Sequence, residues 1–123
     1  MTRFATAVPV LTVRDVAASA AWYAANLGFR CDLHPGGPPS AFATLSRDGV
    51  EIMLARCGKF GMPLVIGRRD WEVYIRVDDL VELCQRLEPR TPVSGPEDKD
   101  YGCREIEVWD PDGHVIVLSQ RIA

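Results

Sequence analysis

The side chains in this sequence that could bind a metal ion or transfer a proton are scattered along the chain, and histidines are few among them. There are two histidines: His34 opens a Pro/Gly-rich loop, and His114 follows an Asp-Gly turn. Glu72 places a carboxylate in a stretch with the alternation of a strand. A catalytic metal needs about three protein ligands and one open position, so these three residues would have to meet from remote loops. We therefore interpret both histidines as surface or turn residues.

Other motifs of catalysis are missing from the sequence. It contains no Gly-rich phosphate loop and no Gly-x-Ser-x-Gly nucleophile elbow. The four cysteines form no Cys-x-x-Cys pair, and we expect reduced structural thiols. Glu72 remains a candidate general base of a metal-free lyase or isomerase. It could equally hold a cationic ligand group, form an ion pair with Arg76 or Arg104, or be exposed at the strand end.

Length and charge limit the class of protein. The 123 residues suit one domain with an ordinary core. The formal net charge of −3 argues against nucleic-acid binding, which depends on cationic side chains that neutralise phosphates. No apolar run approaches the ~20 residues of a membrane helix, and the first residues show no secretory signal. We expect a cytoplasmic protein without membrane or nucleic-acid partners.

Hydrophobic periodicity and turn signals predict two helices and seven strands. Asp15 is a candidate helix N-cap and Gly28 a candidate C-cap, with an apolar stripe between them. Residues 89–102 are polar and predict irregular structure. The expected helices cover 15–27 and 80–87, and the expected strands cover 6–13, 29–33, 42–46, 50–55, 71–77, 104–109 and 115–119.

Two pairs of landmarks share one offset along the chain. Asp79 follows Asp15 by 64 residues (79 − 15), and Gly113 follows Gly49 by 64 (113 − 49). Two independent pairs of residues with the same offset indicate an internal duplication. The sequence therefore predicts an α+β fold of two βαβββ modules within a single domain, at about 5–56 and 70–120, joined by a linker at 57–69.

Each helix should cover one face of its sheet and leave the other face open. Strand alternation predicts the residues of that open face, and the 64-residue offset adds Ile106 as the equivalent of Phe42. Glu107 breaks this pattern, because it would then point toward a helix. The residues expected on the open face are Val8, Val10, Thr12, Phe42, Met53, Glu72, Tyr74, Ile106, Val115 and Val117.

Several of these motifs resemble the vicinal oxygen chelate superfamily, and most of all the bleomycin resistance proteins. They are the opening Ala-Val-Pro-Val-Leu-Thr-Val-Arg-Asp-Val-Ala, the pair Trp22-Tyr23, Leu27-Gly-Phe29, and Tyr101-Gly-Cys-Arg-Glu105 leading to Asp110-Pro-Asp-Gly113. The resemblance runs from about Thr6 to Ser119, and segments 57–70 and 89–100 match nothing clearly. It implies a curved mixed sheet with an open cleft, the glyoxalase/bleomycin resistance fold, usually in a homodimer. The resistance proteins bind the drug without chemistry, whereas sister enzymes hold a divalent metal in the cleft.

The resemblance also indicates where a metal would be held. The superfamily takes its ligands from four positions, which here are Val8, Met53, Glu72 and Val117. Three of these side chains cannot ligate a hard or borderline cation. We therefore expect no metal, no cofactor and no catalytic residue.

An apolar cleft with a few polar groups is typical of a small-molecule site. Phe42 and Tyr101 stand where the resistance proteins carry aromatic residues, although Phe42 suits the core as well. Trp71 could pack on the sheet edge or line the groove, and Arg104 could position Tyr101 or pair with Asp110. The candidate ligand contacts are Phe42, Met53, Trp71, Glu72, Tyr74, Tyr101 and Arg104.

The resemblance implies a non-catalytic protein that binds and sequesters a bleomycin-type antibiotic and thereby confers resistance. The expected ligand is small and ring-containing, and a cationic ligand would suit the acidic run at 97–100. Two alternatives stay open. One is a metal-dependent glyoxalase- or dioxygenase-like lyase or oxidoreductase of the same superfamily, and the other is a regulatory, partner-binding domain.

Overall fold

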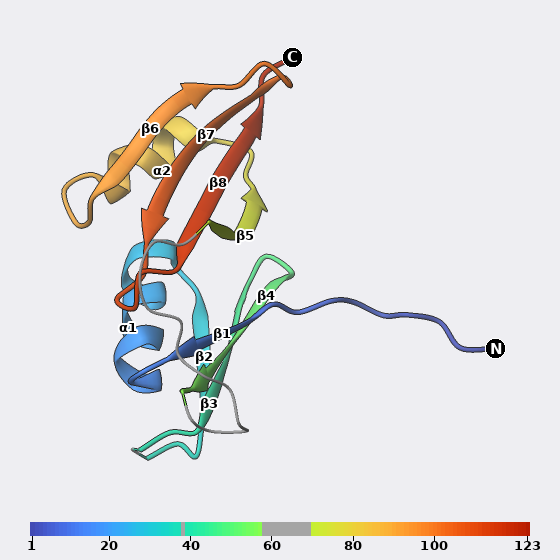
Figure 1. The fold of residues 1–123 in the computed structure, drawn as a ribbon, viewed down its shortest axis with the longest axis vertical. Coiled ribbons are helices and arrows are strands. Elements are labelled where there is room, and N and C mark those ends of the chain that lie inside the picture. Colours follow the sequence, from blue (N-terminus) through green and yellow to red (C-terminus); the bar gives the residue numbers. More distant parts are fainter. Residues whose placement is uncertain (38, 58–69) are drawn as a thin grey trace. The chain divides into compact units, whose positions relative to one another are not determined.

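The computed structural model describes residues 1–37, 39–57 and 70–123, which belong to two units, Met1–Val65 and Ile66–Ala123. Apart from Cys57, the linker expected at 57–69 lies outside the described residues. Both units contain a strand, a helix and three further strands (Figure 1). The prediction of two βαβββ modules is therefore confirmed. Within the described ranges, no helix is long and apolar enough to cross a membrane.

The first module is a four-stranded mixed sheet in the order β1-β4-β3-β2, with α1 packed against it. Strand β1 runs parallel to β4, and the other neighbours are antiparallel. The strand expected over 6–13 begins only at Val10, because Pro9 has no N–H to donate to a sheet. Val8 therefore precedes the strand. The elements are β1 (Val10–Val13), α1 (Val16–Leu27), β2 (Arg30–His34), β3 (Phe42–Arg47) and β4 (Val50–Arg56).

The second module repeats this plan with the strand order β5-β8-β7-β6. Strand β5 is parallel to β8, and helix α2 lies against β7 and β8. The register shifts between Trp71 and Val73, which leaves Glu72 at a bulge near the start of β5. The elements are β5 (Trp71–Arg76), α2 (Leu80–Leu87), β6 (Val93–Asp98), β7 (Cys103–Trp109) and β8 (Val115–Arg121).

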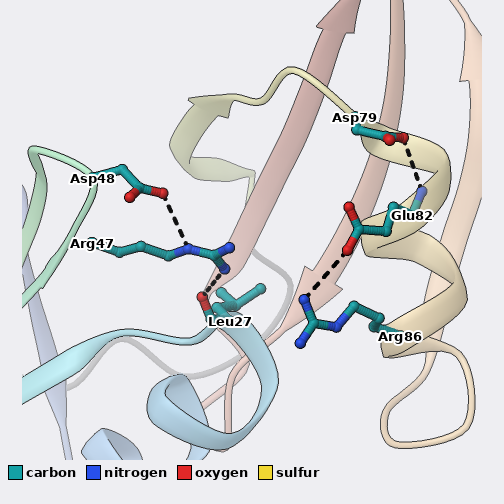
Figure 2. A network of polar contacts seen from close by, with 6 residues as sticks. All are labelled: Leu27, Arg47, Asp48, Asp79, Glu82 and Arg86. Carbon is teal, nitrogen blue, oxygen red and sulfur yellow. Dashed lines mark hydrogen bonds and ion pairs between the residues drawn. The ribbon is translucent and has the colours of Figure 1, made fainter.

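Both helices begin at an aspartate with the same capping bond. The carboxylate of Asp15 accepts a hydrogen bond from the backbone N–H of Ala18 at 3.0 Å, and that of Asp79 accepts one from Glu82 at 3.1 Å (Figure 2). Such a bond pairs one of the N–H groups that a first helical turn leaves free, and it contributes about 1 kcal/mol. The repeated aspartates of the sequence are therefore equivalent structural positions.

The end of α1 is held by the first hairpin. Gly28 adopts the left-handed conformation with φ of 69°, as predicted for a C-cap. The guanidinium of Arg47 donates a hydrogen bond to the carbonyl oxygen of Leu27 at 2.7 Å and also contacts Asp48 (Figure 2). This bond ties the last turn of the helix to the strand β3 that packs beneath it.

The core of each module lies between its helix and its sheet. Tyr23 of α1 is fully buried in the core of the first module. Each buried leucine or isoleucine contributes roughly 1.5–3 kcal/mol relative to an exposed one. The largest buried apolar side chains are Tyr23, Leu45, Ile52 and Leu54 in the first module and Leu80, Leu87, Ile106 and Ile116 in the second.

The fourth strand of the second module, β6, had no predicted residue range, because residues 89–102 were expected to be irregular. Five of its six residues are exposed, so it carries no apolar alternation, and it pairs with β7 only as an edge strand. Pro96 is tolerated at such an edge. Gly95 has φ of 101°, and a Cβ there would lie 2.7 Å from the carbonyl oxygen of Glu105. A glycine is therefore required at this position.

The faces predicted for Ile106 and Glu107 were wrong. Ile106 pairs with Leu118 and is fully buried among the core residues, so it points toward α2. Glu107 pairs with Val117 and lies on the other face of the sheet. The carboxylate of Glu107, which the sequence pattern had placed toward a helix, therefore points away from α2.

The cause is the length of the second hairpin turn. In the first hairpin, the paired residues Arg47 and Val50 enclose two turn residues. In the second hairpin, Asp110 and His114 are joined by a backbone hydrogen bond of 3.0 Å and enclose three turn residues. One additional residue moves a strand by one position relative to its partner and reverses every side chain. The position equivalent to Phe42 is consequently Glu105 and not Ile106: Phe42 pairs with Ala55, and Glu105 pairs with Ser119, 64 residues later (119 − 55).

Candidate ligand-binding face of the second module

We call the side of the second sheet that points away from α2 the distal face. Residues paired across neighbouring strands share a face, so the register assigns its members. The opposite side is anchored to the helix, because the side chain of Gln120 accepts a hydrogen bond from the backbone N–H of Leu80 at 2.8 Å. The distal face consists of Trp71, Tyr74 and Arg76 on β5, Ser94 and Glu97 on β6, Cys103, Glu105, Glu107 and Trp109 on β7, and Val115, Val117, Ser119 and Arg121 on β8.

Glu105 is the centre of a hydroxyl network on this face. Its Oε2 lies 2.5 Å from the hydroxyl of Tyr74, 2.6 Å from that of Tyr101 and 3.5 Å from that of Ser119. The hydroxyls of Tyr74 and Ser119 are also 2.7 Å apart. Three hydroxyl groups from β5, β8 and the turn before β7 thus converge on one carboxylate oxygen.

The second oxygen of Glu105 has no such partner. The residue is only 3% exposed, and Oε1 is buried without a hydrogen bond in the part of the chain that the structure describes. A buried polar atom without a partner typically costs about 1–3 kcal/mol, and more when it is charged. Such an atom requires an explanation.

The network shifts the titration of both tyrosines. Burial, followed by the hydrogen bond to Glu105, raises the pKa of Tyr74 above its ordinary value, and the same two causes in the same order raise the pKa of Tyr101. Both phenols therefore keep their protons at physiological pH and serve as hydrogen-bond donors. Their protons stabilise the carboxylate without supplying a positive charge.

Two aromatic rings lie beside this network. The rings of Trp71 and Tyr74 are 5.8 Å apart with an angle of 39° between their planes, and the indole N–H of Trp71 donates to Glu107. The ammonium of Lys99 lies 6.0 Å from the Trp71 ring, and the guanidinium carbon of Arg76 lies 5.9 Å from the Tyr74 ring. Both distances are within the range of cation–π attraction. These ring faces therefore attract positive charge.

The distal face is rich in exposed aromatic surface. Trp71, Tyr74, Tyr101 and Trp109 are 44%, 37%, 55% and 38% exposed. Several large exposed rings close together mark an interaction surface more often than isolated ones do. The polar groups of Trp71, Tyr74 and Tyr101 are hydrogen-bonded to carboxylates, and the ring faces remain accessible in part.

Glu72 and His114 form a pair that the sequence did not predict. Their Oε2 and Nδ1 atoms are 2.6 Å apart. His114 is 2% exposed, and its backbone N–H donates to Asp110 at 2.9 Å. The interpretation of His114 as an ordinary surface or turn histidine was therefore wrong: it follows the turn, but it is buried and bonded to a carboxylate.

The sequence matches a known family along most of its length. Residues 6–118 fit the family model described as the Glyoxalase/Bleomycin resistance protein/Dioxygenase superfamily. The chain belongs to this superfamily. A search of curated proteins gives no match.

Solved structures of the superfamily share the fold at low sequence identity. TioX from Micromonospora sp. ML1 superposes with a TM-score of 0.73 and 22% identity, covering 95% of this chain and all of TioX. TnmS3, an antibiotic-binding protein from Streptomyces sp. CB03234, gives 0.70 and 24%, covering 98% and 99%. A bleomycin-binding protein complexed with bleomycin gives 0.73 and 23%, covering 96% and 99%. At these identities the likeness establishes the fold.

The residues at the superfamily's metal-ligand positions do not suit a metal. Val8, Met53 and Val117 offer no oxygen or nitrogen donor, and the carboxylate of Glu72 contacts His114. Across the described ranges, no group of three or more His, Cys, Asp or Glu residues could hold a metal ion. The donor chemistry of this chain thus differs from that of the metal-dependent members.

The predicted site residues fall into separate sets. Trp71, Tyr74 and Tyr101 come together around Glu105 and Glu107 in the second module. In the first module, Phe42 stacks on His34 with ring centroids 4.7 Å apart. Met53 pairs there with Val10 and Thr44.

Arg104 is placed differently from what was expected. It pairs with Gln120, and therefore lies on the α2 side, at the end of the sheet. Its guanidinium contacts the carboxylate of Asp98 at 2.6 and 3.1 Å. Those bonds lower the pKa of Asp98. The partner is Asp98, where the sequence had suggested Asp110 or Tyr101.

Sequence reasoning missed three residues of the network: Glu105, Glu107 and Ser119. The missed signal was the length of the turn after β7, which has one residue more than its counterpart. Counting the residues of β7 back from its own hairpin turn, instead of applying the 64-residue offset, would have placed Glu105 and Glu107 on the distal face.

Proposed function

We propose that this protein binds and sequesters a small, ring-containing antibiotic of the bleomycin type without transforming it. The observation that carries the proposal is the distal face of the second module, where three exposed aromatic side chains, Trp71, Tyr74 and Tyr101, are hydrogen-bonded to carboxylates. Aromatic side chains bury large flat areas and stack on ring systems. A few polar groups among such rings give a ligand its orientation.

Two further findings support binding over catalysis. The superfamily positions that would supply metal ligands carry mostly apolar side chains. Two structurally similar proteins are described as antibiotic- or bleomycin-binding. We also propose the homodimer that is usual in the superfamily, which light scattering after gel filtration would test.

Isothermal titration of the purified protein with metal-free bleomycin tests the proposal. We expect saturable binding at micromolar concentration or below, with quenching of tryptophan fluorescence, because Trp71 and Trp109 lie on this face. Trp71→Ala should weaken binding by about tenfold or more, which corresponds to losing one stacking contact with its buried area. Phe4→Ala removes another exposed aromatic ring outside this face and should change nothing.

The absence of heat with soluble ligand would contradict antibiotic binding, and so would equal effects of the two variants. The alternative is a metal-dependent lyase or dioxygenase of the same superfamily. Elemental analysis separates the two, because a near-stoichiometric transition metal in the purified protein would favour the enzyme.

A further inference from the structure

We propose that Glu105 is the anchor for a positively charged, planar nitrogen group of the ligand, such as an amidinium or a guanidinium attached to an aromatic ring. Its free oxygen Oε1 would accept the hydrogen bond, and Trp71 and Tyr74 would take the ring. This inference rests on the proposed function and specifies the chemical class of the ligand for the same face.

The first argument is the uneven use of the Glu105 carboxylate. Oε2 meets the hydroxyls of Tyr74, Tyr101 and Ser119, whereas Oε1 meets no donor among the described residues. The hydroxyls fix the orientation of the carboxylate and leave one acceptor unused. A ligand N–H would pair the acceptor that the fold leaves without a partner.

The second argument is charge. In the described part of the chain, no lysine, arginine or histidine forms an ion pair with Glu105. Its charge is thus balanced only by neutral hydroxyls at a residue that is 3% exposed. A carboxylate buried without a counterion favours a cationic partner over a neutral one, since a charge-assisted hydrogen bond is stronger than a neutral one.

The third argument is that the neighbouring rings already attract the protein's own cations. Lys99 lies over Trp71 and Arg76 over Tyr74. Tyr74 belongs to both arrangements, because its ring is in the aromatic pair and its hydroxyl contacts Glu105. A flat cation stacked on this pair would therefore reach the carboxylate with its charged end.

Access to Oε1 requires a side chain to move, because the atom is covered in this conformation. Tyr101 is the neighbour with the most freedom. It is 55% exposed, it stands in the turn before β7, and its one described side-chain hydrogen bond is to Glu105. Rotation of Tyr101 would break its bond to Oε2 and could uncover Oε1 for the ligand's N–H.

Titrations with benzamidine and benzamide test the anchor, because the two probes match in shape and differ in charge at neutral pH. Binding is followed by NMR chemical shifts of the full-length protein. We expect benzamidine to bind the wild type about tenfold more tightly than benzamide, as one charge-assisted hydrogen bond would give. Glu105→Gln should bring that ratio close to one.

Glu82→Gln is the matched control, because Glu82 carries the same charge on α2, on the other side of the sheet, and its exposed side chain contacts Arg86. It should leave the ratio within about twofold, since a surface charge acts only through a screened field. Tyr101→Phe retains the carboxylate and removes the bond to Oε2 that holds the ring in place, so Oε1 should be easier to uncover and benzamidine should bind about two- to fivefold more tightly. This variant tests the anchor even if Glu105→Gln does not fold.

Equal affinity of the wild type for both probes would overturn the anchor. A preference for benzamidine that survives Glu105→Gln would also overturn it. So would a preference that Glu82→Gln abolishes equally, or a Tyr101→Phe variant that does not bind benzamidine more tightly. If bleomycin binds while the probes show no charge preference, the proposed function stands and only the anchor fails. If neither bleomycin nor either probe binds, both proposals fail.

Discussion

The two modules use one scaffold and differ on the sheet face that points away from the helix. Their caps and hairpin glycines are equivalent: Asp15 corresponds to Asp79, and Gly49 and Gly113 both have a positive φ, of 83° and 84°. The distal positions differ in chemistry. Where the second module has Tyr74, Glu105, Glu107 and Ser119, the first has Val10, Phe42, Thr44 and Ala55.

This difference shows which parts of a duplicated module are free to change. Caps and turns determine the path of the backbone, and a change there affects the whole module. Side chains on the distal face do not fill the helix–sheet core, so they can be replaced without repacking it. In the second module these positions carry a polar network. The additional residue in the hairpin turn after β7 places Glu105 and Glu107 on that face.

The largest expected effect comes from shortening the second turn to the length of the first. Deleting Asp112 would move β7 by one position and turn Glu105 and Glu107 toward α2. An uncompensated buried charge costs about 3–5 kcal/mol, which is comparable with the whole stability of about 5–15 kcal/mol of a small domain. Urea unfolding followed by circular dichroism should show a second module that no longer folds cooperatively.

Pro111→Ala keeps the length of that turn and is the control for the deletion. We expect its free energy of unfolding to stay within about 1 kcal/mol of the wild type. A deletion variant with the wild-type unfolding midpoint would refute the role of turn length in setting the register.

A smaller effect is expected from removing one hydroxyl, in each module in turn, from the sheet face that points away from the helix. Tyr74→Phe takes a donor from the buried carboxylate of Glu105 and should lower the free energy of unfolding by about 1–3 kcal/mol. Thr44→Val changes the first module at the position matching Glu107 and should cost no more than about 0.5 kcal/mol. Equal losses in calorimetry would mean that the network adds no stability.

The smallest expected effect is a shift of the tyrosine titration. Because folding raises the pKa of Tyr74 and Tyr101 above the ordinary value of about 10, the protonated phenols favour the folded state. This contribution is fully present below pH ~10 and is lost as the pH rises through the folded-state pKa values. Ultraviolet absorbance of tyrosinate in Glu105→Gln should rise at a lower pH than in the wild type.

Glu82→Gln serves again as the control, because it removes an exposed carboxylate from α2, on the other side of the sheet. Its titration curve should overlay that of the wild type. If Glu105→Gln overlays it as well, the carboxylate does not act on the two phenols.

The sequence by itself determined the features that depend on neighbouring residues. The helix that ends at Leu27 and the one over Leu80–Leu87 follow from apolar spacing and aspartate caps, and the turn at Asp48-Gly49 from its own chemistry. The duplication and the family resemblance rest on these local signals. They were sufficient to predict the fold class and the two modules.

Tertiary structure decided which face each residue of β7 occupies and which side chains meet. A strand's alternation is the same whichever way it faces, so the register must come from its partner and from the turn between them. Glu105 finds its hydroxyl partners on β5, on β8 and in the turn before β7, and Glu72 finds His114 from 42 residues away. Contacts between residues so far apart in the chain leave no periodic signal in the sequence, because they arise only when the strands pair.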